Sequence, residues 1–462
     1  MTNATMIFFD QARQALHLPE EVLTQFDVQG TAQLASEFPV TDFAVAAIGA
    51  AGMALGELIK VQFGQQPRVV VDRKLASLWF GWSIQPMGWQ MPAAWDSIAG
   101  DYKTQDGWIR LHTNAPHHKA AVLKVLNCAD DRAAVAKEVA KWSGEALETA
   151  VVENKGCAAV MRSLAEWQAH PQGRAVAAEP LISWSFAEAA FPSSTWRPEE
   201  KRPLAGLKVL DLTRVLAGPI ATRFLAGYGA EVLRLDPPEW DEPSVAPEVT
   251  LGKRCARLDI KTPAGRQIFE GLLAQADVLV HGYRPDALAR LGYGEAERRR
   301  INLGLIDVSL NAYGWSGPWA GRRGFDSLLQ MSSGIAHCGM QGAQSDRPVP
   351  LPLPVQALDH ATGYLMAAAT VRALVRRVTE QQASTARLSL ARVAHSLIAL
   401  PRGYVEAKDL EIGPDDLSPT VEKTPWGEAK RCKSPLTVGG LPLVWEIPAS
   451  RLGSAEAKWG EL

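Results

Sequence analysis

Asp359 combines the residue type and the setting that most favour chemistry in this sequence. It follows the proline-rich stretch PVPLPLPVQAL and precedes HATGYLMAAATVRALV, so we expect it where an apolar helix begins. An aspartate in that setting commonly caps the helix. A carboxylate held at a helix N-terminus also stays ionised, and it can then attack a thioester carbonyl to form a mixed anhydride. Both roles stay open, and the adjacent His360 is either a surface residue or a general base.

The connection RVLAGP, residues 214–219, is a second candidate site. It lies where a predicted strand, LKVLDLT, meets a helix that Pro219 opens. Exposed amides and the helix dipole at such a junction suit a phosphate or pyrophosphate. Every parallel α/β protein has turns of this kind, so the pattern leaves phosphate binding and an ordinary turn equally open. The sequence has no G-x-G-x-x-G here, which disfavours a nicotinamide cofactor.

Basic side chains recur on the later connections of the same half of the chain. They lie near predicted strand ends or helix starts, at Lys253, Arg254, Lys261, Arg284 and Arg290. A ligand with several phosphates would be bound by such a distribution. The alternative is solvated surface charge, which is the usual state of lysine and arginine. We interpret the run Arg298 to Arg300 as a solvated helix face.

Composition and charge narrow the class of protein. A chain of 462 residues, 47% hydrophobic and 21% charged, is long enough for two or three domains of an ordinary globular protein. The 48 basic and 50 acidic side chains give a net charge of -2, so we expect no general affinity for nucleic acid or a membrane. An anionic ligand must therefore be bound at a local site.

The cysteines and the N-terminus indicate a cytoplasmic protein. Five widely spaced cysteines without a C-x-x-C pair predict reduced thiols. The N-terminal sequence lacks the basic and apolar regions of a secretion signal. The sequence also lacks H-E-x-x-H, G-x-S-x-G and clustered His/Cys sets, so we expect no metal and no serine triad.

The elements that position these residues fall into two halves. Prolines, serines and charges cluster in residues 191–206, a predicted linker between residues 1–190 and 207–462. In the second half, predicted strands at 207–213, 230–236, 277–280 and 305–310 alternate with predicted helices at 219–226, 262–276 and after Pro285. This alternation predicts an α/β fold with a doubly wound, mainly parallel, Rossmann-like sheet.

The first half contains more helical patterns and fewer strands. The apolar run Phe43 to Gly56 is too short for a bilayer that needs about 20 residues, so we expect a buried helix. Residues 106–113 read as a strand that enters a helix near residue 115. Residues 43–80 and 361–400 share one order of helix, turn, strand (RVVVD or ARLSL) and helix. Duplication and chance recurrence both explain this weak similarity.

The segment LAGLKVLDLTRVLAGPIATRFLAGYGAEVLRLDPP, residues 204–238, resembles the opening of the family III CoA-transferases. That family includes formyl-CoA transferase, carnitine CoA-transferases and α-methylacyl-CoA racemase. Further matching segments follow in the family's order, at GKRCARLDIKTPAGR, ADVLVHGYRPDALARLG, SLNAYGWSGPWAGRRGFDSLLQMSSGI and the helix led by Asp359. The matches cover about half of the chain and are collinear.

The resemblance implies a CoA-binding site and a catalytic aspartate. It implies that acyl-CoA is a substrate, that its CoA part lies along Arg214, Val215, Ala217, Leu258, Lys261, Tyr283 and Arg290, and that Asp359 forms acyl-aspartyl and aspartyl-CoA intermediates. It implies no metal or redox cofactor, a free carboxylic acid as second substrate, and a homodimer. Family members usually carry asparagine and phenylalanine where this chain has Gly282 and Tyr283.

Two departures from the family pattern matter. The racemase branch carries histidine in a G-H-D triplet where this chain has Gly324-Phe325-Asp326, which disfavours racemisation unless His360 or His337 substitutes. The family's smaller α+β domain resembles DGWIRLHTNAPHHKAAVLKVL and KGCAAVMRSLAEWQAHPQ, so we expect it at about residues 100–180, transposed into the first half. CoA transfer, acyl-CoA racemisation or isomerisation, and CoA binding without catalysis therefore stay open, with CoA transfer favoured.

Overall fold

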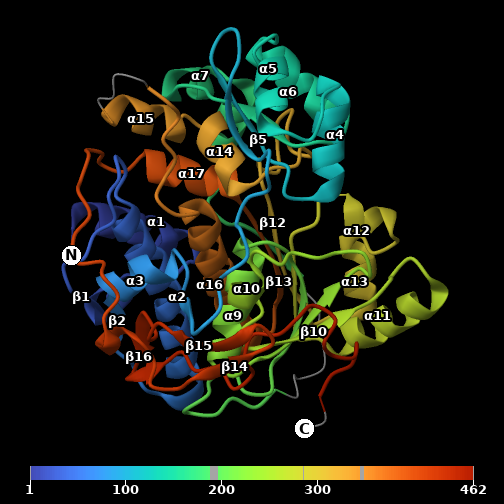
Figure 1. Ribbon diagram of the computed structural model, residues 1–462. Coiled ribbons are helices and arrows are strands. Elements are labelled where there is room, and N and C mark those ends of the chain that lie inside the picture. The colour runs from blue at the N-terminus through green and yellow to red at the C-terminus, as the bar shows by residue number, and fades with distance from the viewer. Residues whose placement is uncertain (1, 188–195, 285, 344–347, 461–462) are drawn as a thin grey trace.

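A seven-stranded sheet forms the centre of the computed structural model, which describes residues 2–187, 196–284, 286–343 and 348–460 (Figure 1). The first part of the predicted linker, up to residue 195, lies outside the described residues. The sheet order is β10-β9-β8-β11-β12-β13-β7, and only the β13–β7 pairing is antiparallel. Counted from β8 this is 3-2-1-4-5-6, the order of a doubly wound sheet. The bounds are β7 Ser183–Ala187, β8 Lys208–Leu212, β9 Glu231–Asp236, β10 Lys253–Arg257, β11 Val278–His281, β12 Ile306–Asn311 and β13 Ala383–Ser389.

Helices cover both faces of this sheet because its strands are apolar on both sides. Val209 and its counterparts in neighbouring strands join one core with α9 (Ala217–Gly227) and α16 (Ala357–Glu380). Leu210 and its counterparts join a second core with α11 (Pro263–Gln275). Alternate residues of a strand point to opposite faces, so a strand covered on both faces needs apolar residues at its odd and its even positions. The doubly wound α/β part of the predicted fold is confirmed.

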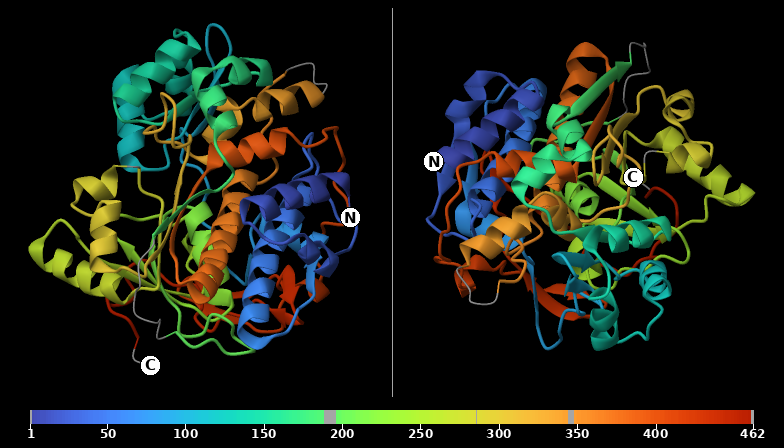
Figure 2. Two further views of the ribbon diagram at one scale, coloured as in Figure 1. Left: turned by 180° about the vertical axis from the view of Figure 1, so that it is seen from behind. Right: turned by 90° about the horizontal axis from the view of Figure 1, so that it is seen from above.

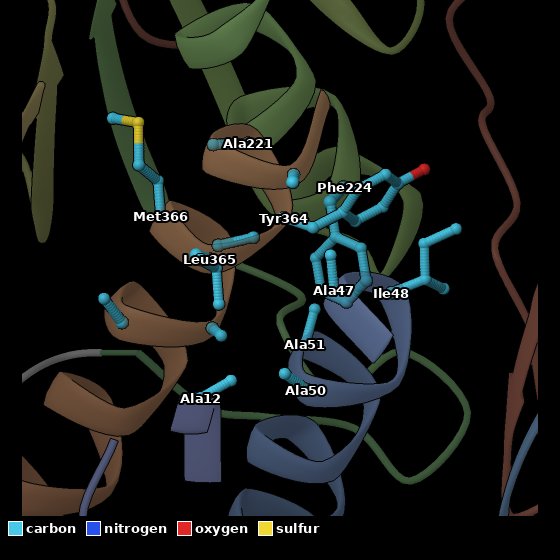
Figure 3. Packing of buried hydrophobic residues seen from close by; sticks show 14 of the residues in the cluster. Ala12, Ala47, Ile48, Ala50, Ala51, Ala221, Phe224, Tyr364, Leu365 and Met366 are labelled. Atoms are coloured by element: carbon cyan, nitrogen blue, oxygen red, sulfur yellow. The ribbon is translucent and has the colours of Figure 1, made fainter. Parts of the chain in front are cut away.

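Helix α2 (Val40–Phe63) packs against α16, as the close-up shows (Figure 3). It extends the predicted buried run of residues 43–56 to 24 residues. By length and composition alone it could cross a membrane, yet 83% of its most apolar window is buried inside the protein. The prediction of a buried helix is confirmed, although the helix is longer than expected.

The two ends of the chain build sheets together. Strands β1 (Phe26–Gln29) and β2 (Val69–Asp72) are continued by β16 (Leu436–Val438) and β17 (Leu441–Pro442). Strand β3 (Ile84–Pro86) pairs with β15 (Gly427–Arg431), which pairs with β14 (Glu422–Thr424). The two views of Figure 2 show these C-terminal strands beside the N-terminal helices. Segments more than 300 residues apart therefore share hydrogen bonds.

A smaller α+β unit, which we call the small domain, lies at one end of the molecule (Figure 1). Its antiparallel sheet consists of β4 (Gly100–Lys103), β5 (Trp108–Leu111) and β6 (Ala158–Val160). Helices α4 (Pro116–Leu126), α5 (Arg132–Val139) and α6 (Gly144–Glu153) close a separate hydrophobic core over it. The predicted smaller α+β domain is thereby confirmed as part of the fold.

The remaining helices connect these units. Their bounds are α1 Asn3–Ala15, α3 Arg73–Trp79, α7 Leu164–Ala169, α8 Pro171–Ala178, α10 Ala246–Val249, α12 Ala287–Arg290, α13 Glu295–Ile301, α14 Asp326–Ser332, α15 Ile335–Gly342 and α17 Leu390–Ile398.

The prediction that the run Arg298 to Arg300, on α13, is a solvated helix face is wrong for Arg298. Arg298 is only 7% exposed because its guanidinium pairs with the buried Asp307 at 2.6 Å. Only Arg300, which pairs with Glu297 near the surface, fits the predicted solvated face.

Candidate active site

A cavity of about 950 Å³ opens between the carboxyl end of the large sheet and the small domain. The second half of the chain lines it with the loops after β8 and β9 and with the starts of α14 and α16. The first half contributes residues 80–82, 93–96, 112 and 114–117. Ligands of doubly wound proteins bind at this end of the sheet, and the volume suits a large organic ligand.

Asp359 lies at the wall of this cavity with its carboxyl group unpaired. It is the third residue of α16, whose N-cap is Gln356, so the alternative that Asp359 caps the helix is wrong. The backbone N–H of Asp359 donates to Asp326 Oδ2 at 2.9 Å. Among the described residues, no side chain or amide donates to the Asp359 carboxyl group, and the residue is only 7% exposed. An accessible acceptor is thus held beside a large cavity.

Burial and the neighbouring Asp326 raise the pKa of Asp359 well above its ordinary value. Burial also raises the pKa of Asp326 to about 6, although a bond from Gln330 opposes this rise. Two buried carboxyl groups in contact disfavour a second negative charge. Contrary to the expectation from the helix N-terminus, the pKa of Asp359 is therefore raised and not lowered. Its carboxylate forms only at a higher pH than an exposed aspartate would require.

His360 is a buried residue and not a surface residue. Its ring stacks on Phe80 with 5.0 Å between centroids, and it borders the cavity beside Asp359. Burial lowers the pKa of His360 to about 3, so the imidazole is neutral near pH 7. His337, the other histidine considered as a racemase base, is not among the residues that line this cavity.

The cavity brings two of the predicted CoA-binding residues together with Asp359. Arg214 lies over the rings of Trp240, at 4.4 Å, and Tyr283, at 5.4 Å, and its Nη2 donates to the Tyr283 hydroxyl at 3.3 Å. Arg214 and Val215 both line the cavity. Because Tyr283 follows β11 and Arg214 follows β8, this contact spans the point where the strand order reverses.

The Val215 amide is already occupied. Val215 has a left-handed φ of 65°, and its N–H donates to Glu242 Oε2 at 2.9 Å. Arg234 in turn donates to Glu242 Oε1 at 2.5 Å and compensates its charge. A carboxylate therefore takes the position at which free amides were expected to receive a phosphate.

The other predicted CoA-binding residues do not line this cavity. Ala217 is buried at the start of α9, and Leu258 packs against the second core. Lys261 is exposed, and Arg290 is exposed and pairs with Asp286 at 2.6 Å. Their part in binding CoA stays a prediction.

Sequence reasoning missed the contribution of the small domain. His112 stacks on Phe325 of the G-F-D triplet, with centroids 3.7 Å apart and an interplanar angle of 8°. Trp95 and Asn114 line the same cavity. The polar and aromatic cluster HTNAPHH, which begins at the end of a predicted strand, is the signal that could have marked this wall.

Comparison with known proteins identifies the class. The family model described as CoA-transferase family III matches residues 204–410. This part of the chain, just under half of it, contains Arg214, Asp326 and Asp359 and is similar to CoA-transferase family III, as its resemblance implied.

Several similar proteins carry transferase names. An acyl-CoA transferase of Gibberella moniliformis is 32% identical over 58% of this chain and 50% of its own length. Human succinyl-CoA:glutarate CoA-transferase is 34% identical over 40% of this chain and 45% of its own length. A crystal structure of Rv3272 from Mycobacterium tuberculosis shares 30% identity over 43% of this chain and 58% of that one, with a TM-score of 0.39. The chain spans about half the length of the curated relatives that it matches.

Proposed function

We propose that this protein is a CoA-transferase that moves CoA between an acyl-CoA thioester and a free carboxylic acid through Asp359. The observation that carries the proposal is the unpaired Asp359 carboxyl group at the wall of the 950 Å³ cavity, within the segment that matches the family. A carboxylate without donors keeps its lone pairs available for attack. The names of the relatives agree with this class of reaction.

The proposed reaction proceeds in two halves. A carboxylate oxygen of Asp359 attacks the thioester carbonyl, the C–S bond breaks, and the electron pair leaves with the CoA thiolate, which leaves a mixed anhydride. The thiolate then attacks the Asp359 carbonyl carbon and expels the donor acid, which gives an aspartyl-CoA thioester. An acceptor carboxylate repeats these steps in reverse and regenerates Asp359. No net proton, metal or redox cofactor enters the balance.

An exchange assay tests the proposal. The protein is incubated with a panel of acyl-CoA donors and free acids that begins with succinyl-CoA and glutarate, and new thioesters are measured by mass spectrometry. We expect exchange with at least one pair, and loss of exchange in Asp359→Asn with CoA affinity within a few-fold. Tight CoA binding without exchange across the panel would favour a non-catalytic CoA-binding protein.

An acyl-CoA racemase or isomerase is the second candidate. The observation that favours it is the His112 imidazole, which lies on Phe325 and so stands close to where the racemase branch carries its histidine. Racemisation requires groups that move a proton to and from the α-carbon. Deuterium incorporation at the α-carbon from ²H₂O, without any acceptor acid, would support this reaction and contradict CoA transfer as the main activity. The homodimer implied by the resemblance stays a prediction.

A further inference from the structure

His112 is a fixed imidazole in the cavity that the transfer chemistry described above does not use. It directly follows β5, and its backbone N–H donates to the Cys157 carbonyl at 3.0 Å. Its ring lies flat on Phe325, and Trp95 meets it edge-on at 5.7 Å between centroids. With 6% exposure and contacts from both the small domain and α14, the ring has little freedom to turn.

The two nitrogens of His112 have different surroundings. Nδ1 lies 3.5 Å from Ser327 Oγ, the limiting length of a weak hydrogen bond. If the hydroxyl donates to Nδ1, the proton of the neutral ring resides on Nε2. Within the described part of the chain no protein atom bonds to Nε2. Nε2 is also absent from the fully buried atoms without a partner, and His112 lines the cavity, so a ligand there can accept a hydrogen bond from Nε2–H.

His112 is linked to the nucleophile through two residues in succession. Phe325, on which the imidazole lies, is followed by Asp326 at the start of α14. Asp326 accepts the backbone N–H of Asp359 at 2.9 Å. His112, Asp326 and Asp359 all line the one cavity. His112 and the Asp359 carboxyl group therefore border the same space, joined along the wall by Phe325 and Asp326.

We propose that His112 donates a hydrogen bond from Nε2–H to the thioester carbonyl oxygen while the Asp359 carboxylate attacks the carbonyl carbon. This inference rests on the proposed function. As the new O–C bond forms, the carbonyl π pair moves onto oxygen, and the donor stabilises that charge. The C–S bond then breaks, and the pair leaves with the thiolate. His112 gains and loses no proton.

The surroundings of His112 fit a donor better than an acid or a base. Burial, and then the nearby His118 and Arg110, lower the pKa of His112 to about 3. The ring therefore stays neutral throughout the usual assay range. The other groups that face it are the aromatic rings of Phe325 and Trp95 and the Ser327 hydroxyl. A neutral donor contributes equally at every assay pH, whereas a base would add a limb to the pH profile.

Three variants separate donation from packing. His112→Phe keeps a ring on Phe325 and removes the donor. His112→Gln places an amide N–H near the position of Nε2, and His112→Asn places one near Nδ1. His337→Gln is the matched control because His337 lies outside the cavity. Each is assayed with succinyl-CoA and glutarate, or with the panel pair that exchanges fastest, and melting curves establish folding.

We expect kcat about 100-fold lower for His112→Phe, the loss typical of one such donor, with KM for the thioester within a few-fold. His112→Gln should retain more kcat than His112→Asn, with the pH profile unchanged in shape. Wild-type kcat in His112→Phe, or His112→Asn at least as active as His112→Gln, would overturn the inference. If His112→Phe does not fold, the kcat values of His112→Gln and His112→Asn still test the inference. If the wild-type protein forms no adduct on Asp359, this result contradicts the proposed function itself and is distinct from a failure of the His112 inference.

Discussion

Helices α2 and α16 are two versions of one structure within the same chain. Each has 24 residues, each begins at an N-cap with φ -76° and ψ 64°, and each ends at a left-handed residue. Each leads into a strand, β2 or β13, that has one parallel and one antiparallel neighbour. A helix capped by a side chain follows in both, α3 or α17. This agreement extends the weak sequence similarity and favours duplication over chance.

The third residue of each helix is an aspartate, and the two aspartates have opposite surroundings. Asp42 in α2 accepts hydrogen bonds from Thr2 at 2.7 Å and Thr5 at 2.9 Å and pairs with Arg73 at 2.6 Å. Asp359 in α16 has no such partners among the described residues. The Asp42 cavity measures about 240 Å³, against about 950 Å³ beside Asp359. The same backbone position therefore holds a structural ion pair in one copy and an available carboxyl group in the other.

The largest expected difference concerns turnover. Asp359→Asn should lower exchange by at least about 10³-fold, because a neutral amide cannot act as the attacking oxyanion. Asp42→Asn, the matched change in the other helix, should leave kcat within about twofold. The exchange assay on both purified variants measures this. Equal losses of exchange activity in the two variants would contradict the view that only the aspartate of α16 is catalytic.

The free energy of unfolding should depend more on Asp42 than on Asp359, the reverse of the order expected for turnover. Asp42→Asn leaves the guanidinium of Arg73 without its counter-charge in a nearly buried site, which should reduce the free energy of unfolding by about 3 kcal/mol. Asp359→Asn removes one of two adjoining buried carboxyl groups, so it should not reduce that free energy. Urea unfolding followed by circular dichroism checks both. A destabilised Asp359→Asn protein would show that the carboxyl group has a structural partner.

Asp326 should set the pH at which Asp359 becomes active. The carboxyl group attacks only when it is deprotonated, so kcat should rise as the pH passes the pKa of Asp359. Asp326→Asn removes the neighbouring negative charge that, after burial, raises this pKa, so the rise should move to lower pH. The pH dependence of kcat for wild type and variant tests the sign. A rise that moves to higher pH would contradict the assignment.

CoA affinity gives the smallest expected effect. Arg214→Gln should weaken CoA binding about tenfold, since it removes a charged donor from the large cavity. Arg402→Gln alters an arginine that lines the small cavity beside Asp42 and should change that affinity by less than twofold. Isothermal titration with CoA compares the two. Similar losses would indicate that the small cavity also binds CoA.

The sequence allowed the parallel strands and the nucleophile candidate to be predicted because their signals are local. The parallel strands have continuous apolar runs, and Asp359 stands at a visible boundary between a proline-rich stretch and an apolar helix. The bounds of β8, β9, β11 and β12 agree with prediction to within about two residues.

The predictions that failed depend on contacts across the chain. Arg298 is buried because Asp307, on a different strand, compensates its charge. Burial, and then Asp326, 33 residues earlier, raise the pKa of Asp359. His112 reaches the cavity from a small domain more than 200 residues before Asp359. Periodicity within a segment carries no information about such neighbours.

Peptide mass spectrometry after quenching with a thioester donor tests the central claim most directly. The protein is mixed with each acyl-CoA of the panel, quenched in acid and digested, and the peptides that contain Asp42 and Asp359 are compared. We predict an acyl or CoA adduct on the Asp359 peptide alone, and none in Asp359→Asn. An adduct on another residue, or active exchange without any adduct on Asp359, would contradict the account.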